Sequence, residues 1–160
     1  MEIYLLRHGA AENALPGNAD ADRRLTEEGK RKTAAVVRTA RGGGLGAALV
    51  ISSPYARAVE TARIAMAELG VDRELTQTPS LVPYGSPEVV WRELRNYREE
   101  PAVLLAGHEP LLGALAAYLL NSPALVVEMK KSAMVRIDTM GTWPTPRGVL
   151  RWMLTAGLAE

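Results

Sequence analysis

The sequence has 160 residues, of which 48% are hydrophobic, and this size and composition are typical of one compact domain, here residues 1–160. Its 19 basic and 18 acidic residues leave a net charge of +1, which argues against a nucleic-acid partner. The absence of cysteine excludes disulfides, thiolate metal sites and cysteine nucleophiles.

The first half of the chain predicts two strands, each followed by a helix. The apolar run at residues 3–6 predicts a buried strand, and a polar loop rich in Asp, Asn and Arg separates it from a helix that begins at about Thr26, the predicted cap. The second apolar run, residues 47–51, predicts another buried strand. The next helix is predicted to have Ser53 as its cap and Pro54 at its first position.

The second half continues this alternation. A surface helix is predicted to begin at Ser86, since apolar residues then recur at helical spacing. The third buried strand, residues 102–106, leads into residues 111–120, which are apolar nearly all round and predict a buried helix. This run is interrupted by Gly113 and is too short for a membrane span of about 20 residues. Because Arg7 ends the first apolar run, no secretory signature is present, and we expect a cytoplasmic protein with no membrane partner.

The C-terminal part predicts an antiparallel pair of strands, residues 133–139 and 149–154, joined by a loop that contains Gly141. The alternation of strands and helices before this pair predicts an α/β fold in which helices cover a sheet. Ligands of such folds gather beyond the carboxyl ends of the strands. The two histidines of the chain, His8 and His108, follow two of these ends.

Cationic and imidazole side chains follow all three buried strands. Arg7 and His8 follow the first strand, Arg57 lies in the opening turn after the second, and His108 follows the third. Because the carboxyl ends of parallel strands meet at one edge of a sheet, we expect the four side chains to share one crevice. Two guanidinium groups beside two imidazoles predict an anion site that suits a phosphate or phosphoryl group.

The histidine at the end of the first strand can also react. The reference pKa of imidazole is about 6.5, so His8 has a neutral ring nitrogen that can attack phosphorus once a hydrogen bond fixes its tautomer. Gly9 is expected to let the backbone approach the transferred group. Arg7, Arg57 and a protonated His108 would then stabilise the charge on the phosphoryl oxygens. This scheme requires no metal and no cofactor.

These residues also carry a resemblance to a known family. Four motifs resemble those of the histidine phosphatase superfamily, also called the phosphoglycerate-mutase-like family: RHG at 7–9, LTEEG at 25–29, SSPYARAVETA at 52–62 and GHEP at 107–110. The short chain, LVPYG at 81–85 and KKSA at 130–133 are similar to bacterial SixA-type phosphohistidine phosphatases. The resemblance implies a three-layer α/β/α sandwich with a mainly parallel sheet. It also implies that His8 is the phosphorylated nucleophile and that Arg7, Arg57 and His108 complete the phosphate pocket.

Other polar residues have open or minor assignments. Arg23 matches an arginine of SixA-type relatives, and it is predicted either to contact substrate or to be a solvated surface charge. Lys130 and Lys131 are interpreted as charges at the rim of the pocket. Glu109 adjoins His108 but is interpreted as a cap of the helix that follows.

The sequence has no convincing general acid, and this gap bears on the substrate. Glu74 and Glu88 are the acids of the middle segment, and neither has the signature of a proton donor. A phosphate ester releases an alkoxide, which needs a proton, whereas phosphohistidine releases imidazole, a far better leaving group. The sequence therefore predicts a phosphatase that acts on phosphohistidine in a partner protein and releases phosphate. Two alternatives stay open: a phosphatase for a small phosphate ester, and a phospho-recognition module without catalysis.

Overall fold

The computed structural model describes residues 1–46, 48–140 and 144–160. Within these ranges one sheet is formed by the strands β1 (Glu2–Arg7), β2 (Leu49–Ser52), β3 (Thr76–Gln77), β4 (Ala102–Gly107), β5 (Met134–Thr139) and β6 (Gly148–Leu154). The helices are α1 (Glu27–Gly42), α2 (Ala56–Leu69), α3 (Pro87–Leu94), α4 (Leu111–Leu119) and α5 (Ala156–Ala159). Short 3-10 turns lie at Asp20–Asp22, Pro79–Leu81 and Arg95–Tyr97.

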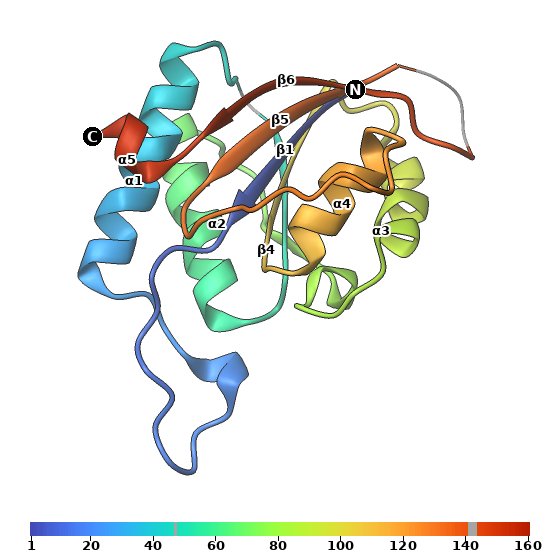
Figure 1. The fold of residues 1–160 in the computed structure, drawn as a ribbon. Helices are drawn as coiled ribbons and strands as arrows, with labels where there is room; N and C mark the ends of the chain where they lie inside the picture. The colour runs from blue at the N-terminus through green and yellow to red at the C-terminus, as the bar shows by residue number, and fades with distance from the viewer. Residues whose placement is uncertain (47, 141–143) are drawn as a thin grey trace.

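The sheet has the order β3-β2-β4-β1-β5-β6, and helices cover both of its faces (Figure 1). Strands β1 to β4 pair in parallel, whereas β5 pairs antiparallel with β1 and β6 pairs antiparallel with β5. The predicted three-layer fold with an antiparallel C-terminal edge is therefore confirmed.

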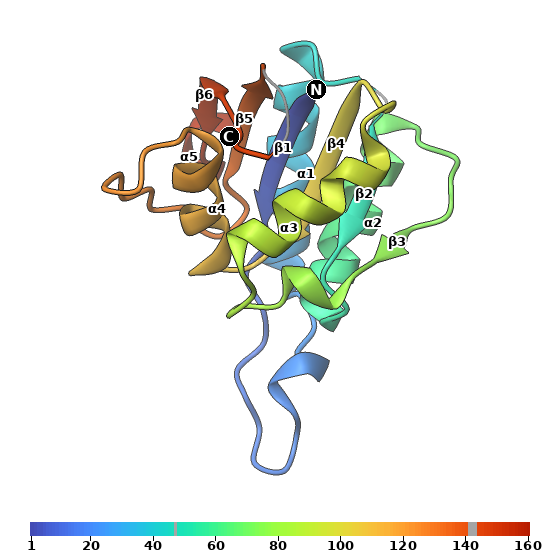
Figure 2. The same ribbon diagram turned by 90° about the vertical axis from the view of Figure 1, so that its right-hand side faces the viewer.

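Alternating side chains of the central strands supply the two cores. In β1, Ile3 and Leu5 pack with α3 and α4 on one face of the sheet (Figure 2). Tyr4 and Leu6 pack with α1 and α2 on the opposite face, because successive side chains of a strand point to opposite sides. Both faces of β1 are buried at residues 3–6, which explains why this part of the strand is continuously apolar. Among the helices of the described residues, none combines the length and the hydrophobicity that a membrane span requires.

The structure confirms one of the two helix caps predicted in the first half of the chain and contradicts the other. Thr26 caps α1 as predicted, since its hydroxyl accepts a hydrogen bond from the Gly29 N–H at 3.0 Å. The predicted Ser53 cap is wrong, because α2 begins at Ala56 and Tyr55 precedes it without a side-chain cap. The Ser53 hydroxyl lies instead in the turn between β2 and α2, within hydrogen-bonding distance of a histidine described below.

Two predicted segments fall partly outside the described residues. The predicted strand over residues 47–51 corresponds to β2, and residue 47 itself is not described. Residue 141, in the predicted loop between β5 and β6, is likewise outside the described ranges.

The loop between β1 and α1 projects beyond the carboxyl ends of β1 and β4 (Figures 1 and 2). It carries the 3-10 turn Asp20–Asp22, which folds back against the start of α2. This loop, the β2-α2 turn and the β4-α4 turn surround the edge of the sheet at which the sequence predicts an anion site.

Candidate active site

The parallel register of β1 and β4 places the two histidines side by side. Arg7 pairs with Gly107, and the His8 N–H donates a hydrogen bond to the Gly107 carbonyl oxygen at 3.0 Å. The ring centroids of His8 and His108 are 5.0 Å apart. The predicted meeting of both histidines at one edge of the sheet is thus what the structure shows.

Arg57 reaches the same point from the first turn of α2. Its side chain is buried, and its Nε donates to His8 Nε2 at 3.3 Å. The guanidinium lies over the ring of Tyr55, 5.1 Å from the ring centroid. Tyr55 also contacts His108 edge-on, with ring centroids 5.0 Å apart. The expectation that Arg57 is a buried site residue and not a solvated helix charge agrees with this geometry.

The hydrogen bonds of His8 define its tautomer. His8 Nδ1 lies 2.7 Å from the Gly9 carbonyl oxygen. A carbonyl oxygen only accepts hydrogen bonds, so the ring proton is on Nδ1 and the lone pair is on Nε2. Burial, together with the charges of Arg57 and Arg7, lowers the pKa of His8 to about 4, although the hydrogen bond to the Gly9 carbonyl oxygen acts in the opposite direction. At neutral pH, Nε2 is therefore an unprotonated nitrogen beside a guanidinium group.

His108 is neutral as well. Its Nε2 lies 2.9 Å from the Ser53 hydroxyl, and its Nδ1 is buried without a hydrogen-bond partner among the described residues. Burial lowers the pKa of His108 to about 3, helped by His8 and Arg57. The sequence-based expectation of a protonated His108 concerns the state with a bound phosphoryl group; in this structure the ring is neutral, because a further positive charge in a buried cationic cluster is unfavourable.

The two ring pKa values can be tested directly, because the chain has only two histidines. With the pKa of His8 lowered to about 4 and that of His108 to about 3, we expect neither ring to take up a proton as the pH falls from about 8 to 5. NMR of the ring protons measures this. In the urea-unfolded protein both rings should titrate near the reference pKa of about 6.5. A ring of the folded protein that titrates there would contradict the proposed effect of burial.

Arg7 is oriented by the segment that precedes β5. Its guanidinium donates to the Met129 carbonyl oxygen at 2.6 Å, while its Nε is buried without a partner among the described residues. The Met129 N–H donates to the Glu109 carboxylate at 2.9 Å, and the other carboxylate oxygen accepts from the Gly113 N–H at 3.3 Å. Glu109 thus caps α4 as predicted. It also holds the segment that orients Arg7.

Asp20 is a site residue that the sequence analysis missed. Arg57 donates to the Asp20 carbonyl oxygen at 2.6 Å and to its carboxylate at 2.9 Å. Hydrogen bonds from Arg23 and Arg57 hold the pKa of Asp20 below its usual range, so the carboxylate is ionised at neutral pH. An acid in a loop without periodicity carries no sequence signal of where it folds back, which is why Asp20 was missed.

Arg23 acts on the site through Asp20. It donates from one nitrogen to the Asp20 carboxylate at 2.8 Å and from Nε to the Glu12 carbonyl oxygen at 2.7 Å. The hydrogen bonds of its side chain therefore go to the projecting loop and to neither histidine. Of the five residues that the sequence proposed, His8 contacts both Arg57 and His108. The charge of Arg7 also reaches both rings, since it lowers the pKa of each.

The geometry of these residues agrees with a match to a known family. Residues 3–82 match the family model of the histidine phosphatase superfamily (branch 1). The chain belongs to the histidine phosphatase superfamily. The matched segment contains His8 and Arg57, while His108 lies beyond it.

Two relatives and one solved structure are similar to this histidine phosphatase beyond the segment that the family model matches. An uncharacterized protein of Picosynechococcus sp. is 33% identical over 139 residues, 84% of this chain and 83% of that protein. Phosphohistidine phosphatase SixA of Escherichia coli is 30% identical over 159 residues, 97% of this chain and 94% of that protein. The structure of the protein histidine phosphatase SixA complexed with tungstate matches with a TM-score of 0.87 at 25% identity, covering 100% of both chains. The predicted resemblance to SixA-type proteins is confirmed.

Gly9 of this histidine phosphatase has a packing role that the sequence did not predict. A Cβ atom at Gly9 would lie 2.7 Å from the Thr33 hydroxyl and 2.8 Å from the Gly29 carbonyl oxygen, both on α1. A Cβ atom at Gly29 would in turn lie 2.2 Å from the Ala10 carbonyl oxygen. Glycine at position 9 is therefore required by the close packing of α1 against the RHG segment, while the expected approach of its backbone to the transferred group stays a prediction.

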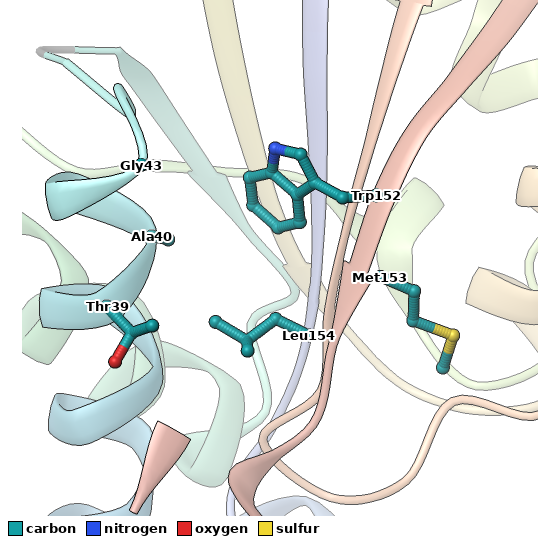
Figure 3. Close-up of a pocket in the computed structure, with 6 residues that line it drawn as sticks. All are labelled: Thr39, Ala40, Gly43, Trp152, Met153 and Leu154. Atoms are coloured by element: carbon teal, nitrogen blue, oxygen red, sulfur yellow. The ribbon is translucent and has the colours of Figure 1, made fainter. Parts of the chain in front are cut away.

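A second hollow of this phosphatase lies away from the histidines. A cavity of about 230 Å³ between α1 and β6 is lined by Thr39, Ala40, Gly43, Trp152, Met153 and Leu154 (Figure 3). Trp152 and Leu154 point from β6 toward α1, while Met153 points to the other side of the strand (Figure 3). None of the six side chains ionises, so this cavity offers no acid-base chemistry. In the part of the chain that the structure describes, no cluster of three or more His, Cys, Asp or Glu side chains could hold a metal ion.

Proposed function

We propose that this histidine phosphatase removes phosphate from phosphohistidine in a partner protein through a covalent intermediate on His8. The observation that supports this most directly is the His8 ring, whose proton is on Nδ1 and whose Nε2 lone pair faces the Arg57 guanidinium. The proposal treats residues 1–160 as a single domain. The overlap with SixA of Escherichia coli along 97% of the chain supports that view.

The proposed reaction has two steps. The lone pair of His8 Nε2 attacks phosphorus, a new nitrogen–phosphorus bond forms, and the bond between phosphorus and the partner's imidazole breaks. A phosphohistidine ring that carries a proton on its free nitrogen leaves as neutral imidazole, so the enzyme need not supply a proton to the leaving group. Water then attacks the phosphorus on His8, which releases inorganic phosphate and restores the ring.

The cationic groups stabilise charge in both steps. Arg57 and Arg7 would donate hydrogen bonds to the phosphoryl oxygens, and Arg57 would exchange its hydrogen bonds to Asp20 for those to the phosphoryl group. A phosphate dianion between the rings raises the pKa of His108, because an opposite charge favours the protonated form. His108 then becomes a donor in the bound state even though it is neutral in this structure.

The choice of phosphohistidine over an ester follows from the acids near the site. Asp20 has a lowered pKa because Arg23 and Arg57 donate to it, so it is a poor proton donor. Glu109 is occupied by the N–H groups of Gly113 and Met129. Glu88 of α3, considered as an acid from the sequence, accepts a hydrogen bond from Ser86, which precedes this helix, and this bond lowers the pKa of Glu88. A site with these acids is suited to a leaving group that needs no proton.

A comparison of leaving groups tests the substrate. We expect kcat/KM for phosphoramidate and for a phosphohistidine peptide to exceed that for phosphoserine or a sugar phosphate by about 10²-fold or more, which is the typical contribution of a general acid. Initial rates of phosphate release measure this. Faster hydrolysis of an ester would reject the phosphohistidine substrate in favour of the small phosphate ester.

The contact between Asp20 and Arg57 leads us to a separate prediction about the binding of inorganic phosphate, the product. The carboxylate occupies the same guanidinium that phosphate would bind, so Asp20→Asn should lower the inhibition constant of inorganic phosphate by about two- to fivefold, the range of a partly exposed ion pair. Asp22→Asn in the same 3-10 turn is the matched control. An inhibition constant that rises in Asp20→Asn would show that the carboxylate orients Arg57 for phosphate and does not compete with it.

A further inference from the structure

A basic groove lies beside the proposed catalytic pocket. It has a volume of about 490 Å³ and is bounded by the start of α1, the segment before β5 and the residues around α5. The residues of the groove that matter here are Arg7, Glu28, Lys32, Lys130, Lys131 and Ser132. The groove is larger than a single phosphate requires. It extends outward from Arg7, whose guanidinium is also part of the proposed catalytic pocket.

The charge of the basic groove is concentrated and mostly unpaired. Three of the four lysines of the chain line it, although the net charge of the whole chain is only +1. Lys32 pairs with Glu28 at 2.7 Å. Lys130 and Lys131 are exposed, and neither forms an ion pair with any residue that the structure describes. The groove therefore presents an excess of positive charge that the protein itself does not neutralise.

The residues that line the basic groove are connected to those of the catalytic pocket through the backbone and by hydrogen bonds. The Ser132 N–H donates to the His8 carbonyl oxygen at 3.1 Å, and the Arg7 N–H donates to the Ala133 carbonyl oxygen at 3.0 Å. Ser132 has φ +62°, and its hydroxyl is hydrogen-bonded to Thr33 of α1 at 3.0 Å. Lys131 is close enough to His8 that its charge contributes to the lowered pKa of that ring. The turn that carries both lysines is thus anchored directly beside the nucleophile.

We propose that the basic groove docks an acidic segment of the phosphorylated partner protein, next to its phosphohistidine. This inference rests on the proposed function and names the chemistry of the partner. The cations come from three separate parts of the chain, and the three lysines are point charges on flexible stems. Such charges suit several carboxylates spread along a segment, whereas a second phosphate is better matched by the bidentate fork of arginine.

Two peptides of the same length test the groove. One has three glutamates beside phosphohistidine, and the other has glutamines at the same places. At low salt we expect kcat/KM of the wild-type protein to be about tenfold higher for the acidic peptide, and this ratio should fall toward one as salt is added. In the double variant Lys130→Gln/Lys131→Gln the ratio should be close to one at every salt concentration.

The fourth lysine supplies the matched control. Lys30 lies on α1 outside the groove and is paired with Glu27 at 2.7 Å, so Lys30→Gln should keep the wild-type ratio. Equal rates for the two peptides with the wild-type protein would overturn the proposal. A preference for the acidic peptide that survives in the double variant would overturn it as well.

Two further measurements separate the possible failures. Binding of the unphosphorylated acidic peptide should be weakened in the double variant, and this readout does not depend on turnover. If the wild-type protein hydrolyses neither phosphoramidate nor phosphopeptide, the proposed function fails. If it hydrolyses both without preferring glutamates, only the docking proposal fails. Should the double variant lose affinity for a small bisphosphate while both peptides bind equally, the groove is a second phosphate subsite and the acidic-partner proposal is rejected.

Discussion

Replacing His8 by alanine is expected to abolish turnover, with at most about 10⁻⁴ of the wild-type rate remaining. The imidazole supplies the atom that becomes bonded to phosphorus, and the groups around it cannot substitute for that bond. His108→Ala should be milder, a loss of about 10²- to 10³-fold, because it removes one of several donors to the phosphoryl oxygens. Phosphate release from phosphoramidate measures both variants.

Trapping of the intermediate separates the enzyme from a binding module. Wild-type protein mixed with ³²P-labelled phosphoramidate and quenched without acid should carry label, and His8→Ala should carry none. Circular dichroism of His8→Ala controls for misfolding. Equal and mild losses in His8→Ala and His108→Ala would contradict the assignment of His8 as nucleophile. Unlabelled wild-type protein that still binds phosphate would indicate the non-catalytic phospho-recognition module.

Replacing Arg57 by lysine is expected to lower kcat/KM by about 10²- to 10³-fold, the typical effect of losing a preorganised donor to a developing charge. The guanidinium donates at once to His8 Nε2 and, through its two other nitrogens, to Asp20. A lysine keeps the positive charge but cannot present a planar set of donors to two oxygens. Steady-state rates with phosphoramidate, together with the melting temperature, test this.

The control for Arg57→Lys comes from the same helix. Arg63 is exposed on α2, and Arg63→Lys should leave both the rate and the melting temperature unchanged. An Arg57→Lys enzyme that keeps its rate within a few-fold would mean that charge alone suffices at this position. That result would argue against the bidentate contact with the phosphoryl group.

Continuous apolar runs identified β1, β2 and β4 because strands covered on both faces have no exposed side to make polar. The two-residue strand β3 was missed because two residues establish no periodicity. Their positions at the ends of predicted strands indicated Arg7, His8, Arg57 and His108 as candidates for one site, since parallel strands bring their carboxyl ends to one edge of the sheet. The start of α2 was predicted two residues too early. A Ser-Pro pair is typical of a helix start, and the sequence does not reveal that the Ser53 hydroxyl lies within hydrogen-bonding distance of His108 instead.

The amino-acid sequence was sufficient to predict the alternation of strands and helices, the edge of the sheet at which the candidate site lies and the cationic character of that site. These properties depend on local patterning and on the chain order of the elements. The folded structure was needed to find that Asp20 folds back onto Arg57, that Gly9 is required by α1 and that His108 is neutral. Burial and contacts between residues distant in sequence arise only once the elements have packed together, so no local pattern reports them.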